Sequence, residues 1–330
     1  MIGLVYSPHF AMGFPGLRYL HPFDSYRARR AYNVLAQHLG LPRRGLSPGA
    51  SQNFGNLRLC APTHRVSDTE LELVHSPEYL RTTRRSMTIA TAVEVPPFAL
   101  APRWFLDWSL VNPMRWAVSG TLLAAHLALE HGLAFSLTGG FHHAKPNRGE
   151  GFCIFNDIAW TICSLKNEGR IYNAVYVDLD AHQGNGVSVA FLRDPSIRIF
   201  DMFNGSIYPY EEEYVRRRLD VCLPLKPDTS DATYLALLKE YLPTFLDESE
   251  GAHLLIYNAG NDVVQQDPLG GLALSPGGIL ERDRFVIAEA RRRRIPLVFL
   301  PSGGYTIGSY RLIADTILDI VARYSTEQTA

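Results

Sequence analysis

The apolar positions of the chain fall into short runs that are separated by longer amphipathic stretches. The runs have the length and the β-branched and aromatic content of buried strands, and they predict strands at 2–6, 133–138, 174–179, 197–203, 252–258 and 296–301. Patterns with helical period lie between and after them, at 156–168, 183–193, 230–247, 277–294 and 308–323. This alternation predicts an α/β fold with a mainly parallel central sheet and helices on both faces.

Helix-boundary signals dominate the first part of the chain. Capping residues and prolines at the first helical position predict helices that start at Asp24, Ser67, Ser76-Pro77 and Asn112-Pro113 and that end near Leu39, His75 and Gly132. The stretch 41–66 is expected to be irregular, and the proline-rich stretch 95–103 is expected to be a long surface loop. Because no change in composition follows that loop, we expect residues 1–330 to form a single catalytic domain.

Composition narrows the class of protein. The chain has 32 Lys and Arg against 33 Asp and Glu, which argues against a dedicated nucleic-acid-binding protein. Its 4 cysteines are widely spaced and fit reduced thiols better than a disulfide framework. The N-terminus lacks the pattern of a signal peptide, and no apolar run approaches the ~18 residues of a membrane span. We therefore expect a cytoplasmic protein.

Polar motifs follow four of the predicted strands. In open parallel sheets, ligands bind beyond the carboxyl ends of the strands. The motifs at these ends are Gly139-Gly140-Phe141-His142-His143, Asp178-Leu179-Asp180-Ala181-His182, Asn258-Ala259-Gly260-Asn261-Asp262 and Ser302-Gly303-Gly304-Tyr305. We expect their side chains to meet at one edge of the sheet.

The stretch from Val177 to Gly186 carries the strongest chemical signal. If the strand before it continued through His182, the side chains of Asp178, Asp180 and His182 would share one face. Buried carboxylates are unfavourable unless a cation or hydrogen-bond donors satisfy them, and Asp and His are suitable ligands for zinc or iron(II). The alternative is a polar strand end whose aspartates cap a helix.

Together the motifs supply the groups needed for amide hydrolysis. Asp180, His182 and Asp262 would give a metal three protein ligands and leave a position for water, whose pKa the metal lowers. The histidine pair could take the proton from that water and return it to a leaving amine. The hydroxyl of Tyr305 could donate to the developing oxyanion. Such a site needs no nucleophilic serine or cysteine.

These motifs, together with Gly151-Phe152-Cys153, resemble the histone deacetylase and acetylpolyamine amidohydrolase family, which has the arginase/deacetylase fold. They occur in the order of the family and spread over the whole chain. Segments that resemble its class IV branch in particular are Leu20-His21-Pro22-Phe23-Asp24, Asp180-Ala181-His182-Gln183-Gly184-Asn185-Gly186, Tyr257-Asn258-Ala259-Gly260 and Leu269-Gly270-Gly271-Leu272.

The resemblance implies a role for each site residue. It implies a metal, zinc or alternatively iron(II), on the three ligands named above. His143 would be the main general base, His142 would be held by the carboxylate of Asp178, and Tyr305 would polarise the scissile carbonyl. Further implied sites are a substrate channel formed by Phe152, Tyr208, Gly151 and Gly304, and a K⁺ site formed by Asp178, Asp180, His182 and Asp201.

One residue departs from the pattern of the family. Many members have an aspartate three residues after the metal-binding histidine, where it orients the second histidine of the pair; this chain has Asn185. A neutral amide can hold the imidazole but does not favour its charged form. We therefore expect a lower pKa for His143 than an aspartate would give, which suits a base that is neutral at pH 7.

The resemblance implies a zinc-dependent hydrolase that removes acetyl or longer acyl groups from lysine ε-amides of a protein or peptide. An acetylpolyamine amidohydrolase is the alternative, and it predicts acidic residues at the mouth of the channel. An arginase-like ureohydrolase is disfavoured, because Gln183 and Gly184 stand where a second metal would need a carboxylate. A catalytically silent scaffold would have no need of Tyr305 and both histidines.

Overall fold

The computed structural model describes the chain except for residues 15–16, 18–21, 211–212 and 328–330. Leu20 and His21, which belong to a class IV-like segment, therefore lie outside the described residues. The strands are β1 (Ile2–Val5), β2 (Ser51–Phe54), β3 (Leu57–Cys60), β4 (Leu133–Ser136), β5 (Ala174–Asp178), β6 (Ile197–Asn204), β7 (Val221–Leu225), β8 (Leu255–Asn258) and β9 (Leu297–Leu300).

Within the described chain, these strands form one 9-stranded sheet in the order β2-β3-β1-β4-β9-β8-β5-β6-β7. Only β2 and β3 pair in antiparallel fashion; every other neighbouring pair is parallel. The prediction of a mainly parallel sheet is confirmed. The four strands that end in polar motifs are the adjacent β4, β9, β8 and β5, so their carboxyl ends lie side by side.

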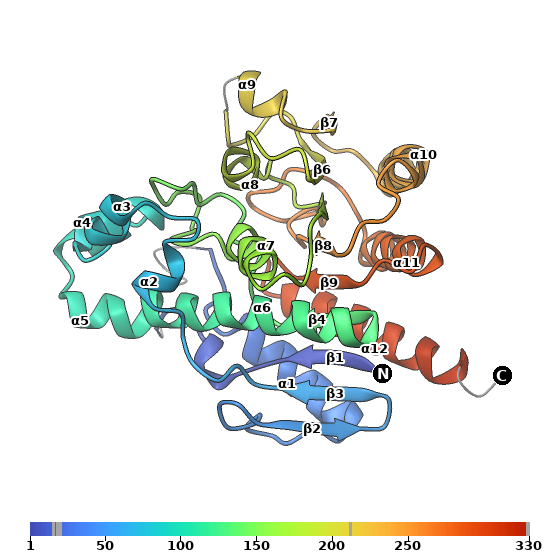
Figure 1. Cartoon of the computed structure of the whole chain (residues 1–330), viewed down its shortest axis with the longest axis horizontal. Helices are drawn as coiled ribbons and strands as arrows, with labels where there is room; N and C mark the ends of the chain where they lie inside the picture. The colour runs from blue at the N-terminus through green and yellow to red at the C-terminus, as the bar shows by residue number, and fades with distance from the viewer. Residues whose placement is uncertain (15–16, 18–21, 211–212, 328–330) are drawn as a thin grey trace.

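Helices cover both faces of the sheet, which explains why its central strands β4, β5, β8 and β9 are buried along their whole length and consist mainly of apolar residues. The helices are α1 (Arg27–Leu39), α2 (Asp68–Leu71), α3 (Pro77–Thr82), α4 (Ser86–Ala92), α5 (Arg103–Leu106), α6 (Asn112–His131), α7 (Asp157–Asn167), α8 (Asn185–Ala190), α9 (Glu213–Arg216), α10 (Asp231–Asp247), α11 (Pro276–Arg292) and α12 (Ser309–Glu327). In Figure 1, α6 and α7 lie in front of the sheet, whereas α1 and α12 lie behind it.

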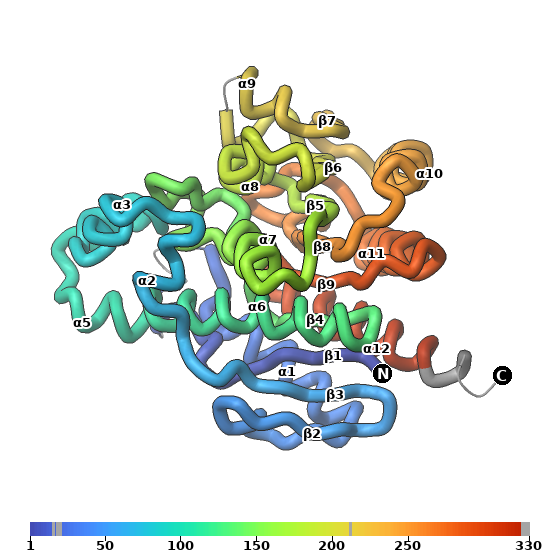
Figure 2. Tube along the Cα trace, viewed as in Figure 1, coloured from blue at the N-terminus to red at the C-terminus, as the bar shows by residue number. Residues whose placement is uncertain are grey.

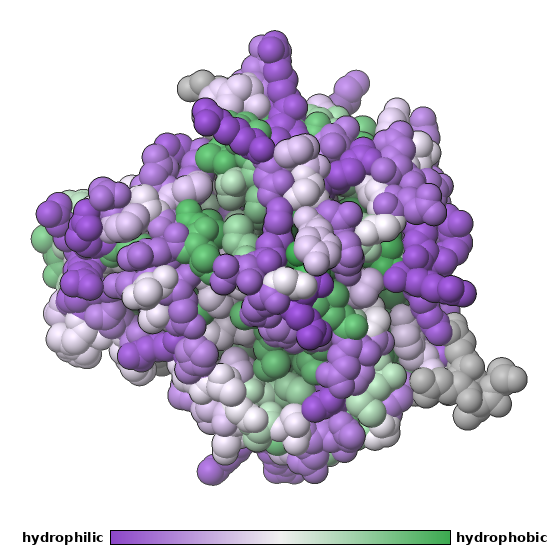
Figure 3. Space-filling view, in the orientation of Figure 1, coloured by the Kyte–Doolittle hydropathy of each residue, from purple (hydrophilic) through white to green (hydrophobic). Residues whose placement is uncertain are grey.

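The N-terminal strand and the last helix of the described chain belong to the same part of the molecule. Figure 2 follows the trace from the N-terminal strand β1 to α12, which packs against α1 and α11. The helices α3 to α5 form a lobe that extends beyond the sheet (Figure 1). Polar side chains cover most of the face in Figure 3, with apolar side chains showing mainly in recesses. No helix among the described residues is both long and apolar enough to cross a membrane.

The capping signals predict some helix ends correctly. Ser67 and Glu70 form a capping box at the start of α2, and the Ser76 side chain caps α3 with proline at the first helical turn. The helices α1 and α6 end at glycines with left-handed backbone, Gly40 and Gly132.

Other boundaries predicted from the sequence are wrong, in whole or in part. Asp24 does not cap α1; the helix starts at Arg27, and Asp24 Oδ1 accepts from the backbone N–H of Tyr26 instead. The α-helix α6 starts at Asn112 as predicted, but Asn112 does not cap a free helix end, because helical backbone already runs from α5 through a π-helical turn at 107–111 into α6. The helix α2 ends at Leu71, short of His75.

The strands β2, β3 and β7 and several short helices, among them α5 and α9, were not predicted. The stretch 41–66 contains β2 and β3, and β2 is an exposed edge strand without apolar alternation. The strand β7 carries Pro224, which only an edge position tolerates. The stretch 95–103, predicted as a loop, holds a 3-10 helix at Pro96–Leu100 and the start of α5.

Candidate active site

Two loops bring together a cluster of three potential metal ligands. The strand β5 ends at Asp178, so the strand does not continue through His182, which was the condition for the expected same-face projection of Asp178, Asp180 and His182. Asp180 and His182 instead come from the loop after β5, and Asp262 comes from the connection after β8. One ligand atom from each lies within 4.8 Å of the others, and all three residues are buried. His182 Nδ1 lies 3.1 Å from Asp180 Oδ1 and 2.9 Å from Asp262 Oδ2.

The electrostatics of this cluster favour a bound cation. Burial and the neighbouring Asp180 raise the pKa of Asp262 to about 7. Burial opposes the charged form of His182, but the two carboxylates outweigh it and raise its pKa to about 10. In the metal-free site, His182 and Asp262 therefore tend to keep their protons, which reduces the repulsion between the carboxylates of Asp180 and Asp262. Two carboxylates and an imidazole are a suitable donor set for zinc or iron(II), so the residues fit such an ion.

Close backbone approach fixes both carboxylates. The N–H of Gly303 donates to Asp180 Oδ2 at 2.8 Å, and that of Ala181 donates to Asp262 Oδ1 at 3.0 Å. A Cβ at Gly303 would lie 2.3 Å from Asp262 Oδ2, and one at Gly260 would lie 2.3 Å from Asp180 Oδ2. These two glycines are therefore needed for the loops to reach the ligands.

The first residue of the histidine pair has an anionic partner. His142 Nδ1 lies 2.8 Å from Asp178 Oδ2, and the same carboxylate accepts from Tyr176 Oη at 2.5 Å and from Asn258 Nδ2 at 3.0 Å. Burial lowers the pKa of His142, but Asp178 and Asp180 outweigh burial and raise it to about 9. His142 is therefore cationic near neutral pH.

The second histidine has a neutral partner. His143 Nδ1 lies 2.8 Å from Asn185 Oδ1. Burial, followed by the charges on His142 and His182, holds the pKa of His143 well below its usual value. The two rings are 4.0 Å apart between centroids. One neutral and one charged imidazole thus lie side by side, an arrangement suited to proton transfer in both directions.

Tyr305 lies on the loop after β9, across the metal-ligand cluster. Its backbone N–H donates to Asp267 Oδ2 at 2.7 Å, and its ring makes edge contacts with Phe152 and His182. Burial, followed by the charges of Asp262 and Asp180, raises the pKa of Tyr305 well above its usual value. The hydroxyl therefore stays protonated and can donate a hydrogen bond.

A recess leads to these groups. It is lined by Glu94, His143, Gly151, Phe152, His182, Ile207, Tyr208, Leu269 and Tyr305. Three of the predicted channel residues, Gly151, Phe152 and Tyr208, lie in its wall. Gly304 does not; its carbonyl accepts from the Arg27 guanidinium behind the loop.

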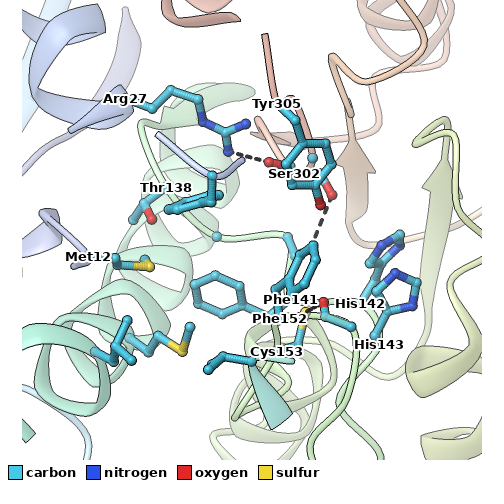
Figure 4. A pocket seen from close by; sticks show the side chains of 18 of the residues that line it. Met12, Arg27, Thr138, Phe141, His142, His143, Phe152, Cys153, Ser302 and Tyr305 are labelled. Carbon is cyan, nitrogen blue, oxygen red and sulfur yellow. Dashed lines mark hydrogen bonds between the residues drawn. The ribbon is translucent and has the colours of Figure 1, made fainter. Parts of the chain in front are cut away.

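A second, mainly apolar pocket lies behind the histidine pair (Figure 4). His142, His143 and Tyr305 contribute to one part of its wall. The remainder is mostly aliphatic, aromatic and thioether side chains, among them Met12, Leu17, Val95, Phe98, Leu110, Met114 and Phe141. Such a lining would accept an apolar group that extends past the reacting centre.

Asp201 lies behind the metal-ligand loop. It is in β6, in register with Asp178 of β5, and its Oδ2 accepts from the N–H of Gly184 at 2.9 Å. Its Oδ1 has no hydrogen-bond partner in the described part of the chain. Burial and the charge of Asp178 raise the pKa of Asp201 well above its usual value. A bound cation would give Oδ1 of Asp201 a partner and would stabilise the charged form of the carboxylate.

Several residues around the site gave no signal in the sequence. Asp157 accepts from the N–H groups of Gly140 at 3.0 Å and Phe141 at 2.7 Å, and so holds the loop that carries the histidine pair. Arg27 donates to the carbonyls of Ser302 and Gly304, which precede Tyr305 in the loop after β9. These contacts join segments far apart in the chain, so neither spacing nor periodicity could have revealed them.

The fold and the site together define a hydrolase of the arginase/deacetylase fold. A family model of the histone deacetylase domain matches residues 21–321. The chain belongs to the histone deacetylase family and is, as a member of it, a hydrolase that acts on acetylated amides.

Individual relatives support this assignment. The chain is 38% identical to histone deacetylase 2 of Arabidopsis thaliana over 96% of its own length and 78% of that protein. It is 28% identical to the acetoin utilization protein AcuC of Staphylococcus aureus, over 76% of the chain and 69% of that protein. The crystal structure of the HDA15 HD domain superposes with a TM-score of 0.72 at 18% identity, covering 97% of this chain and 90% of that one. The last comparison bears on the fold alone.

Proposed function

We propose that the protein is a zinc-dependent lysine deacylase that hydrolyses ε-amides of acetyl-lysine or longer acyl-lysine in proteins. The observation that carries the proposal is the position of the buried Asp180–His182–Asp262 cluster beside one neutral and one charged histidine. Amide hydrolysis requires a base for the attacking water and an acid for the leaving amine. The histidine pair has both protonation states within a single site.

Each protein group has a role that follows from its surroundings. Asp180, His182 and Asp262 would hold zinc, which when bound acidifies water and polarises a carbonyl. Neutral His143 takes the proton of the attacking water and later returns it to the lysine amine. His142, kept cationic by Asp178, stabilises negative charge that develops beside it. The Tyr305 hydroxyl donates to the oxygen of the scissile carbonyl as it becomes anionic.

The two recesses match the two ends of the substrate. Phe152 and Tyr208 provide aromatic walls suited to the methylene stem of a lysine side chain. The apolar pocket behind the histidines would receive the acyl group, and its lining supports chains longer than acetyl. The segments that resemble the class IV branch support placing the protein in that branch of the family.

The proposal also includes the bound ions, the extent of the domain and the cellular compartment. Iron(II) is an alternative to zinc on the same donor set. A potassium ion beside Asp178 and Asp201 would offset two buried carboxylates that lie in register on adjacent strands. We take residues 1–330 as one catalytic domain that acts in the cytoplasm without contacting nucleic acid.

One observation favours a second candidate function. Glu94 lies at the mouth of the lysine recess and is exposed. An acidic group there would attract a cationic amide such as an acetylated polyamine. An acetylpolyamine amidohydrolase is therefore the alternative to a protein deacylase.

Substrate competition separates the two functions. Zinc-loaded protein is given lysine peptides whose acyl groups range from acetyl to long fatty chains, and separately N-acetylated polyamines. The proposal predicts a higher kcat/KM for the peptides, with loss of turnover after chelation and recovery with zinc. A higher kcat/KM for polyamines that falls in Glu94→Gln would support the alternative. Turnover of neither class by zinc-loaded protein would refute both.

A further inference from the structure

The partner of the proposed general base is itself held by an acidic residue. Asn185 Oδ1 faces His143 Nδ1 at 2.8 Å, and Asn185 Nδ2 donates to Glu150 Oε1 at 2.7 Å. Three side chains thus form a chain from a carboxylate, through an amide, to the imidazole. Asn185 stands where many members of the family have an aspartate, whereas the sequence pattern gives no role to Glu150.

Glu150 is well placed for this contact. Its Oε1 also pairs with Lys145 Nζ at 2.9 Å, and its Oε2 pairs with Arg148 Nε at 2.6 Å. Its backbone N–H and carbonyl form hydrogen bonds with the carbonyl and N–H of Cys153, which closes a turn around Gly151 and Phe152. Only 19% of its side chain is exposed. Burial opposes ionisation, but the two cations outweigh it and keep the pKa of Glu150 below its usual value.

The direction of the hydrogen bonds then determines the tautomer of His143. An ionised carboxylate can only accept, so the side of Asn185 that faces Glu150 must be the NH₂ group. The amide oxygen of Asn185 consequently faces His143. Because that oxygen can only accept, His143 Nδ1 must carry the hydrogen, and in the neutral ring Nε2 keeps its lone pair. The Glu150 carboxylate thereby favours this orientation of the amide over the one that presents NH₂ to the imidazole, which would favour the opposite tautomer.

We propose that Glu150 is a positioning residue that fixes the Asn185 amide and thereby selects the His143 tautomer with a basic Nε2. This inference rests on the proposed function, because it concerns the general base of that reaction. The acidic partner of the base does not contact the imidazole directly. One neutral side chain, Asn185, lies between the Glu150 carboxylate and the His143 ring. The ring is thereby oriented without direct contact between the imidazole and an anion.

The test compares Glu150→Ala, which removes the acceptor, with Glu150→Gln, which keeps an oxygen for Asn185. We expect Glu150→Ala to lower kcat by roughly 10- to 100-fold with little change in KM, since a misprotonated base loses part of its contribution. Glu150→Gln should stay within about threefold of the wild type. Glu78→Ala, which removes a surface carboxylate paired with Arg81, is the matched control and should leave kcat unchanged.

A double-mutant cycle separates positioning from loop packing. If Glu150 acts through Asn185, Glu150→Ala should have little further effect on kcat in an Asn185→Ala background. Additive losses would mean that Glu150 acts elsewhere, and would overturn the proposal.

The decisive readout does not depend on turnover. The ¹⁵N signals of the His143 ring, assigned with a His143→Gln variant, report which nitrogen carries the hydrogen in zinc-loaded protein. We expect a protonated Nδ1 and an unprotonated Nε2 in the wild type and in Glu150→Gln, and a shift toward the other tautomer in Glu150→Ala. Signals that are the same in Glu150→Ala and the wild type refute the inference whatever happens to kcat. If no acyl substrate is turned over, these signals still decide it.

Discussion

At the scale of single residues, two adjacent histidines differ because their partners differ in charge. His142 and His143 are both buried, and each has an oxygen 2.8 Å from Nδ1. The oxygen belongs to a carboxylate for His142 and to an amide for His143. Burial lowers the pKa of both rings. For His142 the charges of Asp178 and Asp180 outweigh burial and raise the pKa to about 9, whereas the neutral Asn185 cannot offset burial and the charges of His142 and His182, which hold the pKa of His143 well below its usual value.

Giving His143 an anionic partner should move the pH dependence of the reaction. In Asn185→Asp/Glu150→Gln the glutamine amide can donate to the new carboxylate, which stabilises the imidazolium and raises the pKa of His143. A general base works when deprotonated, so the acidic limb of the kcat profile should shift to higher pH. Glu150→Gln alone is the control and should keep the limb of the wild type. An acidic limb at the same pH in the double variant would refute this account of His143.

Removing the hydroxyl of Tyr305 should affect the transition state more than binding. Tyr305→Phe keeps the ring against Phe152 but removes the donor to the oxyanion. We expect kcat to fall by about 100- to 1,000-fold, the usual effect of losing one such donor, with KM changed little. Tyr172→Phe, at a surface position, should behave like the wild type. A loss confined to KM would show that Tyr305 only binds substrate.

At the scale of elements, the site depends on loops that can approach each other only at glycines. The connection from β9 to α12 offers a matched pair. Gly303→Ala would place a Cβ 2.3 Å from Asp262 Oδ2, whereas Gly308 has open space around it. We expect Gly303→Ala to weaken zinc binding by at least about tenfold and Gly308→Ala to leave it unchanged, as measured by competition with a chelator. Equal affinities in the two variants would contradict the assigned ligand geometry.

The same elements show what the sequence can predict. Apolar runs revealed the central strands β4, β5, β8 and β9, because strands buried on both faces must be apolar. Edge strands such as β2 face solvent and carry no such pattern, so they were missed. The polar motifs predicted which residues gather at one edge of the sheet. The contacts that orient them, such as Asp157 with Gly140 or Glu150 with Asn185, depend on loop conformations that no periodicity encodes.

At the scale of the whole molecule, metal binding should be linked to protons and to stability. His182 has a pKa of about 10 and Asp262 one of about 7 in the metal-free site. Zinc must displace the proton of His182 at pH 7, so its affinity should rise by about tenfold per pH unit for each proton released. Calorimetry in buffers of different ionisation enthalpy measures that release. Binding without proton release would contradict the proposed ligands.

The sign of the effect on stability follows from Asp262. Its pKa is higher in the folded state than the ordinary value of 3.8, so folding favours the protonated form. Its contribution to the stability of the metal-free protein is therefore full below about pH 4 and is lost as the pH rises through about 7. Zinc replaces that proton, and the rise in Tm on adding zinc should be larger at pH 7.5 than at pH 5.5.

On the proposed function, a metal-loaded protein with a neutral His143 and a protonated Tyr305 cleaves the ε-amide of an acylated lysine. The most direct measurement is the rate of carboxylate release from an acetyl-lysine peptide by zinc-loaded wild type, His143→Ala and Tyr305→Phe, each also after chelation. We expect the wild type to turn over the peptide, with activity that chelation removes and zinc restores, and rates at least about 100-fold lower in both variants. Turnover that survives chelation, or that is unchanged in His143→Ala, would contradict it.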